Sequence, residues 1–161
     1  MFVVYNILLL LASPVILMIL LAKKRCRPGL RQRLGWLPQG RAAEWGDGRT
    51  IWLHAVSMGE ATAAVPLVQQ LKARYPDFRI VVSTVTETGR ETIQKKLSGQ
   101  AGHLYFPLDY PWAVRSVLDA VRPRLIIIVE TELWPNFLRE AAARGIPVIL
   151  ANGRLATDSF A

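Results

Sequence analysis

The stretch that decides the fold is Trp52-Leu53-His54-Ala55-Val56-Ser57-Met58-Gly59-Glu60, which continues into Ala61-Thr62-Ala63-Ala64. Its first half is apolar enough for a buried strand. A small polar turn follows, and then a helical pattern with a carboxylate in its first turn. In an open α/β sheet, ligands bind beyond the carboxyl ends of the strands. Glu60 at such a place is therefore either a helix cap or a catalytic group.

Apolar runs alternate with helical patterns from Thr50 onward. We expect strands over Ile51–Val56, Phe78–Ser83, His103–Phe106, Leu125–Val129 and Pro147–Ala151, and helices over Glu60–Tyr75, Glu87–Leu97, Tyr110–Val121 and Leu133–Arg144. Gly145, directly after the last helix, fits the position where a helix ends in the left-handed conformation. Nearly continuous apolar strands joined by helices of this length predict a parallel sheet covered on both faces. Residues 50–161 should therefore form a Rossmann-like α/β domain.

The N-terminal stretch from Phe2 to Ala22 contains no charged residue, and only Asn6, Ser13 and Pro14 interrupt its apolar run. A membrane-crossing helix needs roughly 20 such residues. A signal peptide would carry its basic residues before a shorter apolar core, whereas here they follow the apolar run. We therefore expect a single transmembrane anchor over residues 1–22.

The net charge of +8 is concentrated just after this anchor, in a basic juxtamembrane segment and linker over residues 23–49. This segment has only two acids, Glu44 and Asp47, against eight bases: Lys23, Lys24, Arg25, Arg27, Arg31, Arg33, Arg41 and Arg49. Positive charge after a span predicts that the following domain lies on the cytoplasmic face of the membrane. The first six bases should attract anionic headgroups, and Trp36 and Trp45 are candidates for the membrane interface.

Several common chemistries lack their motifs in the sequence. There is no Gly-x-Gly-x-x-Gly after the first strand, no P-loop and no Gly-x-Ser-x-Gly turn. Two scattered histidines and a single cysteine, Cys26, do not predict a metal site, and one cysteine excludes an internal disulfide. Nucleic-acid binding is disfavoured because the charges adjoin the anchor and no aromatic platform is interleaved with them. We expect no cofactor.

Polar or small residues follow every predicted strand, and the carboxyl ends of parallel strands share one edge. In chain order the candidates are Ser57, Gly59, Glu60, Thr84, Thr86, Glu87, Asp109, Glu130, Glu132, Asn152 and Arg154.

Structural interpretations compete with functional ones at this edge. Ser57-x-x-Glu60 and Thr84-x-x-Glu87 both have the spacing of a capping box. Glu132 would suit the N-terminus of the next helix, where the macrodipole favours an anion. His54, inside a strand, is typical of a hydrogen-bonded core residue. On the pattern alone, both roles stay open for Glu60.

Four motifs together resemble the start of a bacterial 3-deoxy-D-manno-octulosonic acid (Kdo) transferase, lipid A-specific. After the anchor and the basic Arg31-Gln32-Arg33-Leu34-Gly35, the motifs are Trp52–Glu60, Ser83–Gly89, Glu130–Asn136 and Asn152–Leu155. The resemblance covers the whole chain. It implies the N-terminal half of a GT-B glycosyltransferase that moves Kdo from CMP-Kdo to the lipid A precursor, lipid IVA. We expect the C-terminal CMP-Kdo-binding domain to be absent, and this half alone to be inactive.

The resemblance also assigns roles to the edge residues. The family reaction inverts the anomeric carbon, so a base must take the proton of the attacking hydroxyl. Glu60 matches the family's base, and Glu130 matches a group that stabilises the transition state. The expected substrate contacts are Ser57, Gly59, Thr84, Thr86, Glu132, Asn152 and Arg154.

Two alternatives remain beside this reading. An anchor, a basic segment and a polar edge would also suit a non-catalytic, membrane-tethered module that binds the acceptor. A GT-B enzyme acting on another lipid-linked acceptor, such as the peptidoglycan precursor, is disfavoured. Its first loop would be glycine-rich, unlike Val56 to Gly59.

Overall fold

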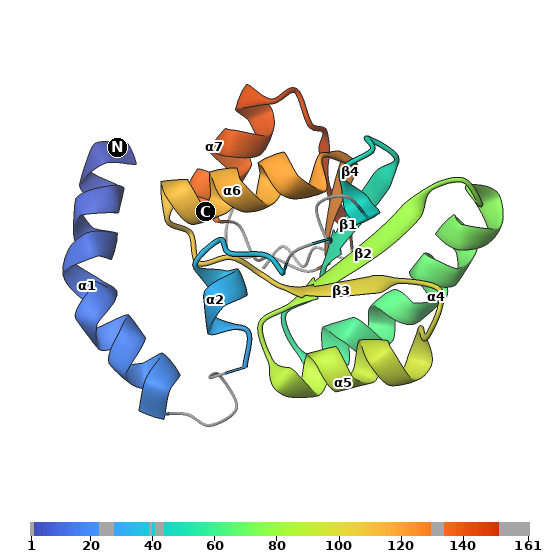
Figure 1. Ribbon diagram of the computed structural model, residues 1–161, viewed down its shortest axis with the longest axis horizontal. Helices are drawn as coiled ribbons and strands as arrows, with labels where there is room; N and C mark the ends of the chain where they lie inside the picture. The colour runs from blue at the N-terminus through green and yellow to red at the C-terminus, as the bar shows by residue number, and fades with distance from the viewer. Residues whose placement is uncertain (1, 23–27, 39, 41–43, 130–133, 152–161) are drawn as a thin grey trace, which may run out of the picture.

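The computed structural model describes residues 2–22, 28–38, 40, 44–129 and 134–151. Its elements, drawn in Figure 1, are α1 (Phe2–Ala22), α2 (Leu30–Arg33), β1 (Thr50–His54), α4 (Met58–Arg74), β2 (Arg79–Thr84), α5 (Glu87–Lys96), β3 (Gly102–Tyr105), α6 (Pro111–Val121), β4 (Pro123–Val129), α7 (Pro135–Ala143) and β5 (Val148–Ala151). The predicted site residues outside these ranges are Lys23, Lys24, Arg25, Arg27, Glu130, Glu132, Asn152 and Arg154.

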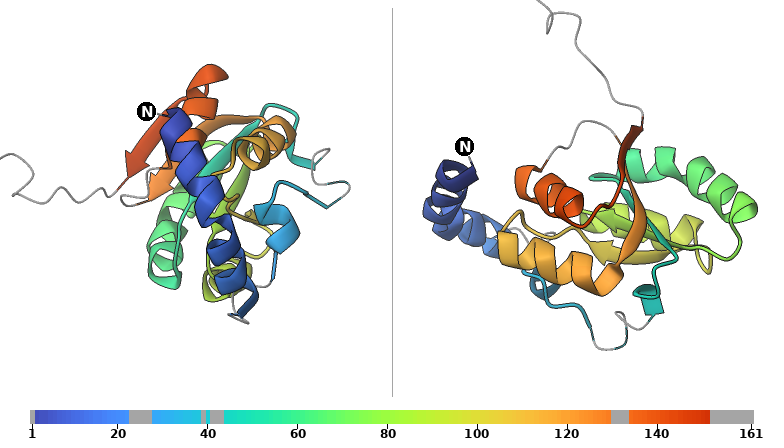
Figure 2. Two further views of the ribbon diagram at one scale, coloured as in Figure 1. Left: turned by 90° about the vertical axis from the view of Figure 1, so that its left-hand side faces the viewer. Right: turned by 90° about the horizontal axis from the view of Figure 1, so that it is seen from above.

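The strands in the described ranges form one parallel five-stranded sheet, in the order β3-β2-β1-β4-β5. Helices α4 and α5 cover one face, and α6 and α7 cover the other (Figures 1 and 2). The strand order reverses between β1 and β4, as in half of a dinucleotide-binding fold. The Rossmann-like prediction is confirmed. Helix and strand ends differ from the expected ones by a residue or two, which is normal for such ends.

Alternate side chains of β1 fill a core on each face of the sheet. Trp52 is fully buried beneath α6 and α7, and its ring meets Phe137 edge-on at 5.2 Å. Leu53 points the other way, into the core beneath α4 and α5. Because β1 is buried on both faces, its register with both neighbouring strands is fixed, and so is the position at which it ends.

The segment around α2 packs on the domain and does not lie free at the membrane. The backbone N–H of Tyr105 donates to Gln32 Oε1 at 3.1 Å, and that of Leu108 donates to the Arg33 carbonyl at 2.7 Å. These contacts cover the end of β3, an edge strand of the sheet. Gly29 has φ +73°, and a Cβ there would overlap the Tyr105 ring.

Two expectations for the linker are wrong. Arg33 is only 2% exposed: its guanidinium donates to the Val85 carbonyl and lies 4.8 Å from the centre of the Tyr105 ring. A carbonyl and an aromatic face compensate the buried cation, so it cannot serve a lipid headgroup. Trp45 is also buried, whereas Trp36 is 65% exposed and Arg31 is exposed, as an interfacial position requires.

Helix α1 lies beside the domain, on the side towards which β2 and β3 run (Figure 1). Three hydrogen bonds between described side chains join the two. Tyr5 donates to Asp109 Oδ2 at 2.8 Å, Asn136 Nδ2 donates to Asn6 Oδ1 at 2.6 Å, and the Ser13 and Tyr110 hydroxyls are 2.5 Å apart. The polar groups of the apolar helix are thus turned towards the domain.

Asp109 joins three parts of the structure with one buried carboxylate. Besides Tyr5, it accepts the backbone N–H groups of Asn136 at 2.9 Å and Phe137 at 2.8 Å. These are donors in the first turn of α7, where a helix has no internal acceptors for them. Burial raises the pKa of Asp109 above its ordinary value, against the opposing effect of these hydrogen bonds.

Replacing Asp109 by Asn should lower the free energy of unfolding by about 1–3 kcal/mol, because an amide nitrogen would face a buried N–H donor. Urea unfolding of the purified protein, followed by tryptophan fluorescence, measures the loss. Asp119→Asn is the matched control: its side chain is 64% exposed and pairs with Arg144 at the surface. That variant should change stability by less than about 1 kcal/mol. Equal losses in the two variants would contradict the role given to Asp109.

Candidate functional site

The candidate site is the edge at which the parallel strands end. In a doubly wound sheet the ligand crevice opens where the strand order reverses, which here is between β1 and β4. Ser57 ends the loop after β1, and Gly59 and Glu60 lie in the first turn of α4. The segments after β4 and β5, with the predicted Glu130, Glu132, Asn152 and Arg154, lie outside the described residues.

Glu60 sits in the first turn of α4, and two donors from the preceding turn hold its carboxylate. The Val56 backbone N–H donates to Oε2 at 2.6 Å, and the Ser57 hydroxyl donates to Oε1 at 2.9 Å. This differs from the expected capping box. Glu60 reaches back one residue further than Ser57, and among the described groups the Ser57 hydroxyl accepts no helix N–H. Ser57 therefore positions the carboxylate instead of capping the helix.

Gly59 leaves the backbone beside Glu60 uncovered. It is exposed, has no unusual φ, and a Cβ built on it would approach only Ser57 Oγ, at 3.9 Å. Glycine in a helix costs about 1 kcal/mol relative to alanine. The packing between described residues gives no reason for a glycine here, because an alanine would fit. A ligand that approaches the backbone closely would explain the glycine, because a side chain there would block it.

The loop after β2 is held by its own side chains. Thr86 is the N-cap of α5 and accepts the Gly89 N–H at 3.1 Å, so the predicted Thr84-x-x-Glu87 box does not form. Thr84 is fully buried, and its hydroxyl lies 3.1 Å from the Thr86 carbonyl and 2.9 Å from His103 Nε2. Both threonines that were predicted to contact substrate are thus engaged in shaping this loop.

Glu87, in the first turn of α5, accepts hydrogen bonds from Arg90 and from the Tyr105 hydroxyl. Although burial raises the pKa of Glu87, these two partners hold it below its ordinary value. The carboxylate is therefore a fixed anion that ties α5 to the end of β3. Of the two carboxylates at described helix starts on this edge, Glu60 is the one without a basic partner in the described contacts.

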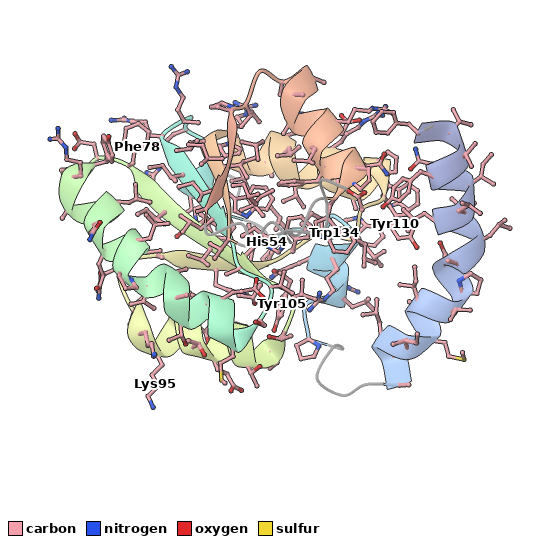
Figure 3. The ribbon with its side chains drawn as sticks, turned by 180° about the vertical axis from the view of Figure 1, so that it is seen from behind. His54, Phe78, Lys95, Tyr105, Tyr110 and Trp134 are labelled. Atoms are coloured by element: carbon pink, nitrogen blue, oxygen red, sulfur yellow. The ribbon has the colours of Figure 1, made fainter. Side chains whose placement is uncertain are left out.

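His54 is the last residue of β1 and is fully buried. Its Nδ1 lies 2.9 Å from Ser83 Oγ, and its ring stacks on Phe106 at 3.8 Å, as expected for a core residue. Burial lowers the pKa of His54 to about 3, so the ring is neutral at physiological pH. In the described part of the chain, Nε2 is buried without a hydrogen-bond partner, as is Nε1 of Trp134 nearby (Figure 3).

Comparison with protein families identifies the family to which this domain belongs. Residues 28–161 match the family described as 3-deoxy-D-manno-octulosonic-acid transferase (kdotransferase). The chain belongs to this family of Kdo transferases. Its parallel sheet and the helices on both faces form the N-terminal domain of that family.

Curated Kdo transferases are similar along much of the chain. One from Haemophilus influenzae is 37% identical over 96% of this chain and 36% of its own length. A probable mitochondrial one from Arabidopsis thaliana is 40% identical over 70% of this chain and 25% of its own length. A bifunctional glycosyltransferase/methyltransferase from Fusobacterium nucleatum is 33% identical over 71% of this chain. The chain therefore spans about a third or less of the length of these relatives.

Within this Kdo transferase chain, the structure brings together Ser57, Gly59 and Glu60 in one turn, and Thr84 with Thr86 in the next loop. The described residues contain no cluster of three or more His, Cys, Asp or Glu side chains that could hold a metal ion. Sequence reasoning missed the Tyr105 hydroxyl, which holds Glu87. No local pattern marks it, because the two residues lie 18 positions apart and meet only in the folded sheet.

The buried neutral His54 should make the stability of this domain depend on pH. A pKa lowered from 6.5 to about 3 means that the unfolded chain binds the proton first. Stability from this group is complete above pH 6.5 and is lost as the pH falls towards 3, by at most about 1.4 kcal/mol per pH unit. The urea midpoints of unfolding are measured at pH 7.5 and pH 4.5 for the unchanged protein and for His54→Gln. The difference between the two proteins separates the effect of His54 from that of the carboxylates, which both proteins share. The loss on acidification should be smaller in His54→Gln, and equal losses would contradict it.

Proposed function

We propose that this chain is the acceptor-binding half of a two-domain GT-B enzyme that transfers Kdo from CMP-Kdo to the lipid A precursor, lipid IVA. The observation that carries the proposal is Glu60 at the carboxyl edge, next to the strand reversal, oriented by two donors and flanked by the bare backbone of Gly59. CMP-Kdo would bind to a second domain of the whole protein.

Glu60 would act as the general base. The acceptor hydroxyl oxygen bonds to the anomeric carbon of Kdo, the bond from that carbon to CMP breaks, and the hydroxyl proton passes to the carboxylate. Each Glu60 oxygen accepts one described hydrogen bond and keeps another lone pair for this proton. A weak base suffices if the transition state is oxocarbenium-like and proton transfer is late. From the resemblance we propose Glu130 as a stabiliser of that state, and Glu132, Asn152 and Arg154 as substrate contacts.

A non-catalytic acceptor-binding module is the second candidate. It is favoured by the fact that both Glu60 oxygens already accept hydrogen bonds from the chain, as a purely structural carboxylate would. The two candidates differ in what an isosteric amide at this position would do.

Replacing Glu60 by Gln in the whole protein should reduce kcat for Kdo transfer by about 10²-fold or more, because an amide cannot take the proton. Its oxygen can still accept the Val56 N–H, so the melting temperature and the binding of the lipid acceptor should change little. Glu91→Gln, an exposed acid on α5, is the control and should turn over normally. Normal turnover by Glu60→Gln would show that Glu60 is only structural.

We propose that α1 holds the protein at the inner (cytoplasmic) membrane with the domain on the cytoplasmic face. The helix is long and apolar enough to cross a membrane, and none of its residues is buried by the domain. Large apolar side chains from Val3 to Leu21 remain exposed, an area that water would not favour. The exposed Arg31, together with Lys23, Lys24, Arg25 and Arg27, would then meet anionic lipid headgroups.

Helix α1 cannot cross the bilayer perpendicularly and keep its contacts with the domain without bringing charged residues into the membrane. At 1.5 Å per residue, Tyr5 would lie about 25 Å from the cytoplasmic surface in a perpendicular crossing. Its partner Asp109 would be carried into the hydrocarbon, and so would Arg139, whose guanidinium lies 5.2 Å from the centre of the Phe2 ring. Charges at that depth are costly. We therefore propose that docked α1 lies along the headgroup boundary, and that the predicted single pass would require these contacts to break.

Site-directed labelling decides between the two arrangements. In whole protein with Cys26→Ser and Val4→Cys, the new thiol should resist a membrane-impermeant maleimide added from the periplasmic side. It should react in inside-out vesicles. Gly48→Cys, in the exposed turn before β1, is the control for cytoplasmic accessibility. Periplasmic labelling of Val4→Cys would establish the single pass and contradict the docked arrangement.

A further inference from the structure

A groove of about 400 Å³ lies between α1 and the start of α6. Leu10, Leu17 and Leu20 of α1 line one side, and Leu34, Leu108 and Trp112 of the domain line the other. We call it the α1 groove. Tyr110, labelled in Figure 3, projects from the domain towards α1 in this region.

The lining of the α1 groove matches hydrocarbon. Its two hydroxyl groups, those of Ser13 and Tyr110, are 2.5 Å apart, and Ser13 also donates to the Leu9 carbonyl at 2.9 Å. Apart from these hydroxyls and the indole of Trp112, the side chains of the lining are apolar. A peptide segment placed there would bury backbone donors and acceptors without partners, which is costly. An alkyl chain brings none.

With α1 at the membrane, as proposed above, the groove lies at a lipid surface. One wall of the groove is the apolar helix α1. Trp112, which lines the groove, is 51% exposed. Trp36, two residues after the lining residue Leu34 in the sequence, is 65% exposed. Tryptophan is enriched where a membrane meets water, because its ring is apolar and its N–H is polar. In that position the groove would be open to acyl chains and not to bulk water alone.

The groove and the candidate site are both formed at the carboxyl ends of the strands. Leu108 and Tyr110 belong to the loop after β3, which is one of the loops of the carboxyl edge. Helix α1 lies on the side of the sheet at which β2 and β3 end, as Figure 1 shows. A lipid whose sugar is bound at the edge would therefore direct a chain into the groove. A bulk phospholipid has no such sugar to fix it there.

We propose that the α1 groove holds an acyl chain of the lipid acceptor whose sugar is bound at the carboxyl edge. This inference rests on the proposed function and adds a substrate subsite to it. Helix α1 is then part of the acceptor site as well as an anchor, and the enzyme distinguishes acylated from deacylated acceptors through this groove.

Filling the groove tests the proposal. In the whole protein in nanodiscs, Leu17→Trp should raise KM for the tetraacylated acceptor about tenfold, equivalent to the loss of roughly two buried methylenes. KM for CMP-Kdo and for the deacylated acceptor should not change. Met18→Trp is the matched control, because Met18 is 63% exposed and does not line the groove. Equal behaviour of the two variants would overturn the proposal.

Photolabelling of the unaltered protein gives a second measurement that does not depend on a folded variant or on turnover. A tetraacylated acceptor with a diazirine on one acyl chain should label peptides containing Leu17 or Leu108, and unlabelled acceptor should suppress this. A phospholipid with the same chain should label them weakly. Strong phospholipid labelling that the acceptor does not suppress would assign the groove to bulk lipid and overturn the proposal. Failure of the proposed function differs from both results: the unaltered protein would transfer no Kdo.

Discussion

The buried carboxylate of Asp109 joins the loop after β3 to α7 and α1, at the edge that carries the candidate site. It satisfies two N–H groups at the start of α7 and accepts the Tyr5 hydroxyl from α1. A helix start, the loop after β3 and the apolar N-terminal helix thus depend on one side chain that is 2% exposed. If any of these three parts were displaced, a buried polar group of Asp109 or of its partners would lose its hydrogen bond and keep its desolvation penalty. This cost couples the positions of the three parts. We propose that an acceptor binds at this edge.

Glu60 illustrates how one arrangement can serve both stability and chemistry. The Val56 N–H and the Ser57 hydroxyl hold its carboxylate at the start of α4, which lowers the entropy cost of presenting it in one geometry. The same contacts would satisfy a purely structural carboxylate. What distinguishes the site is its setting next to the strand reversal, and a neighbouring glycine that described packing does not explain.

Much of the fold could be predicted because its signals are local. Apolar strands separated by helical periods led to the parallel sheet, and Gly145, with φ +65°, ends α7 where expected. The predicted edge residues after β1 and β2 do lie at one edge, because parallel strands all end on the same side. Arg33 could not be placed in this way. Its partners Val85 and Tyr105 are more than fifty positions away in the chain, and a basic run reads the same whether it faces lipid or a carbonyl.

The sequence by itself determined the alternation of strands and helices, the apolar N-terminal helix and the position of Glu60 at the start of α4, since each depends on neighbours within a few residues. Only the tertiary structure decided that Ser57 serves Glu60 instead of the helix, that α1 docks on the domain, and that a groove lies between them. The contacts from α1 join residues about a hundred or more positions apart. Periodicity carries no information about such pairs, because they form only when the sheet brings its carboxyl edge to the helix.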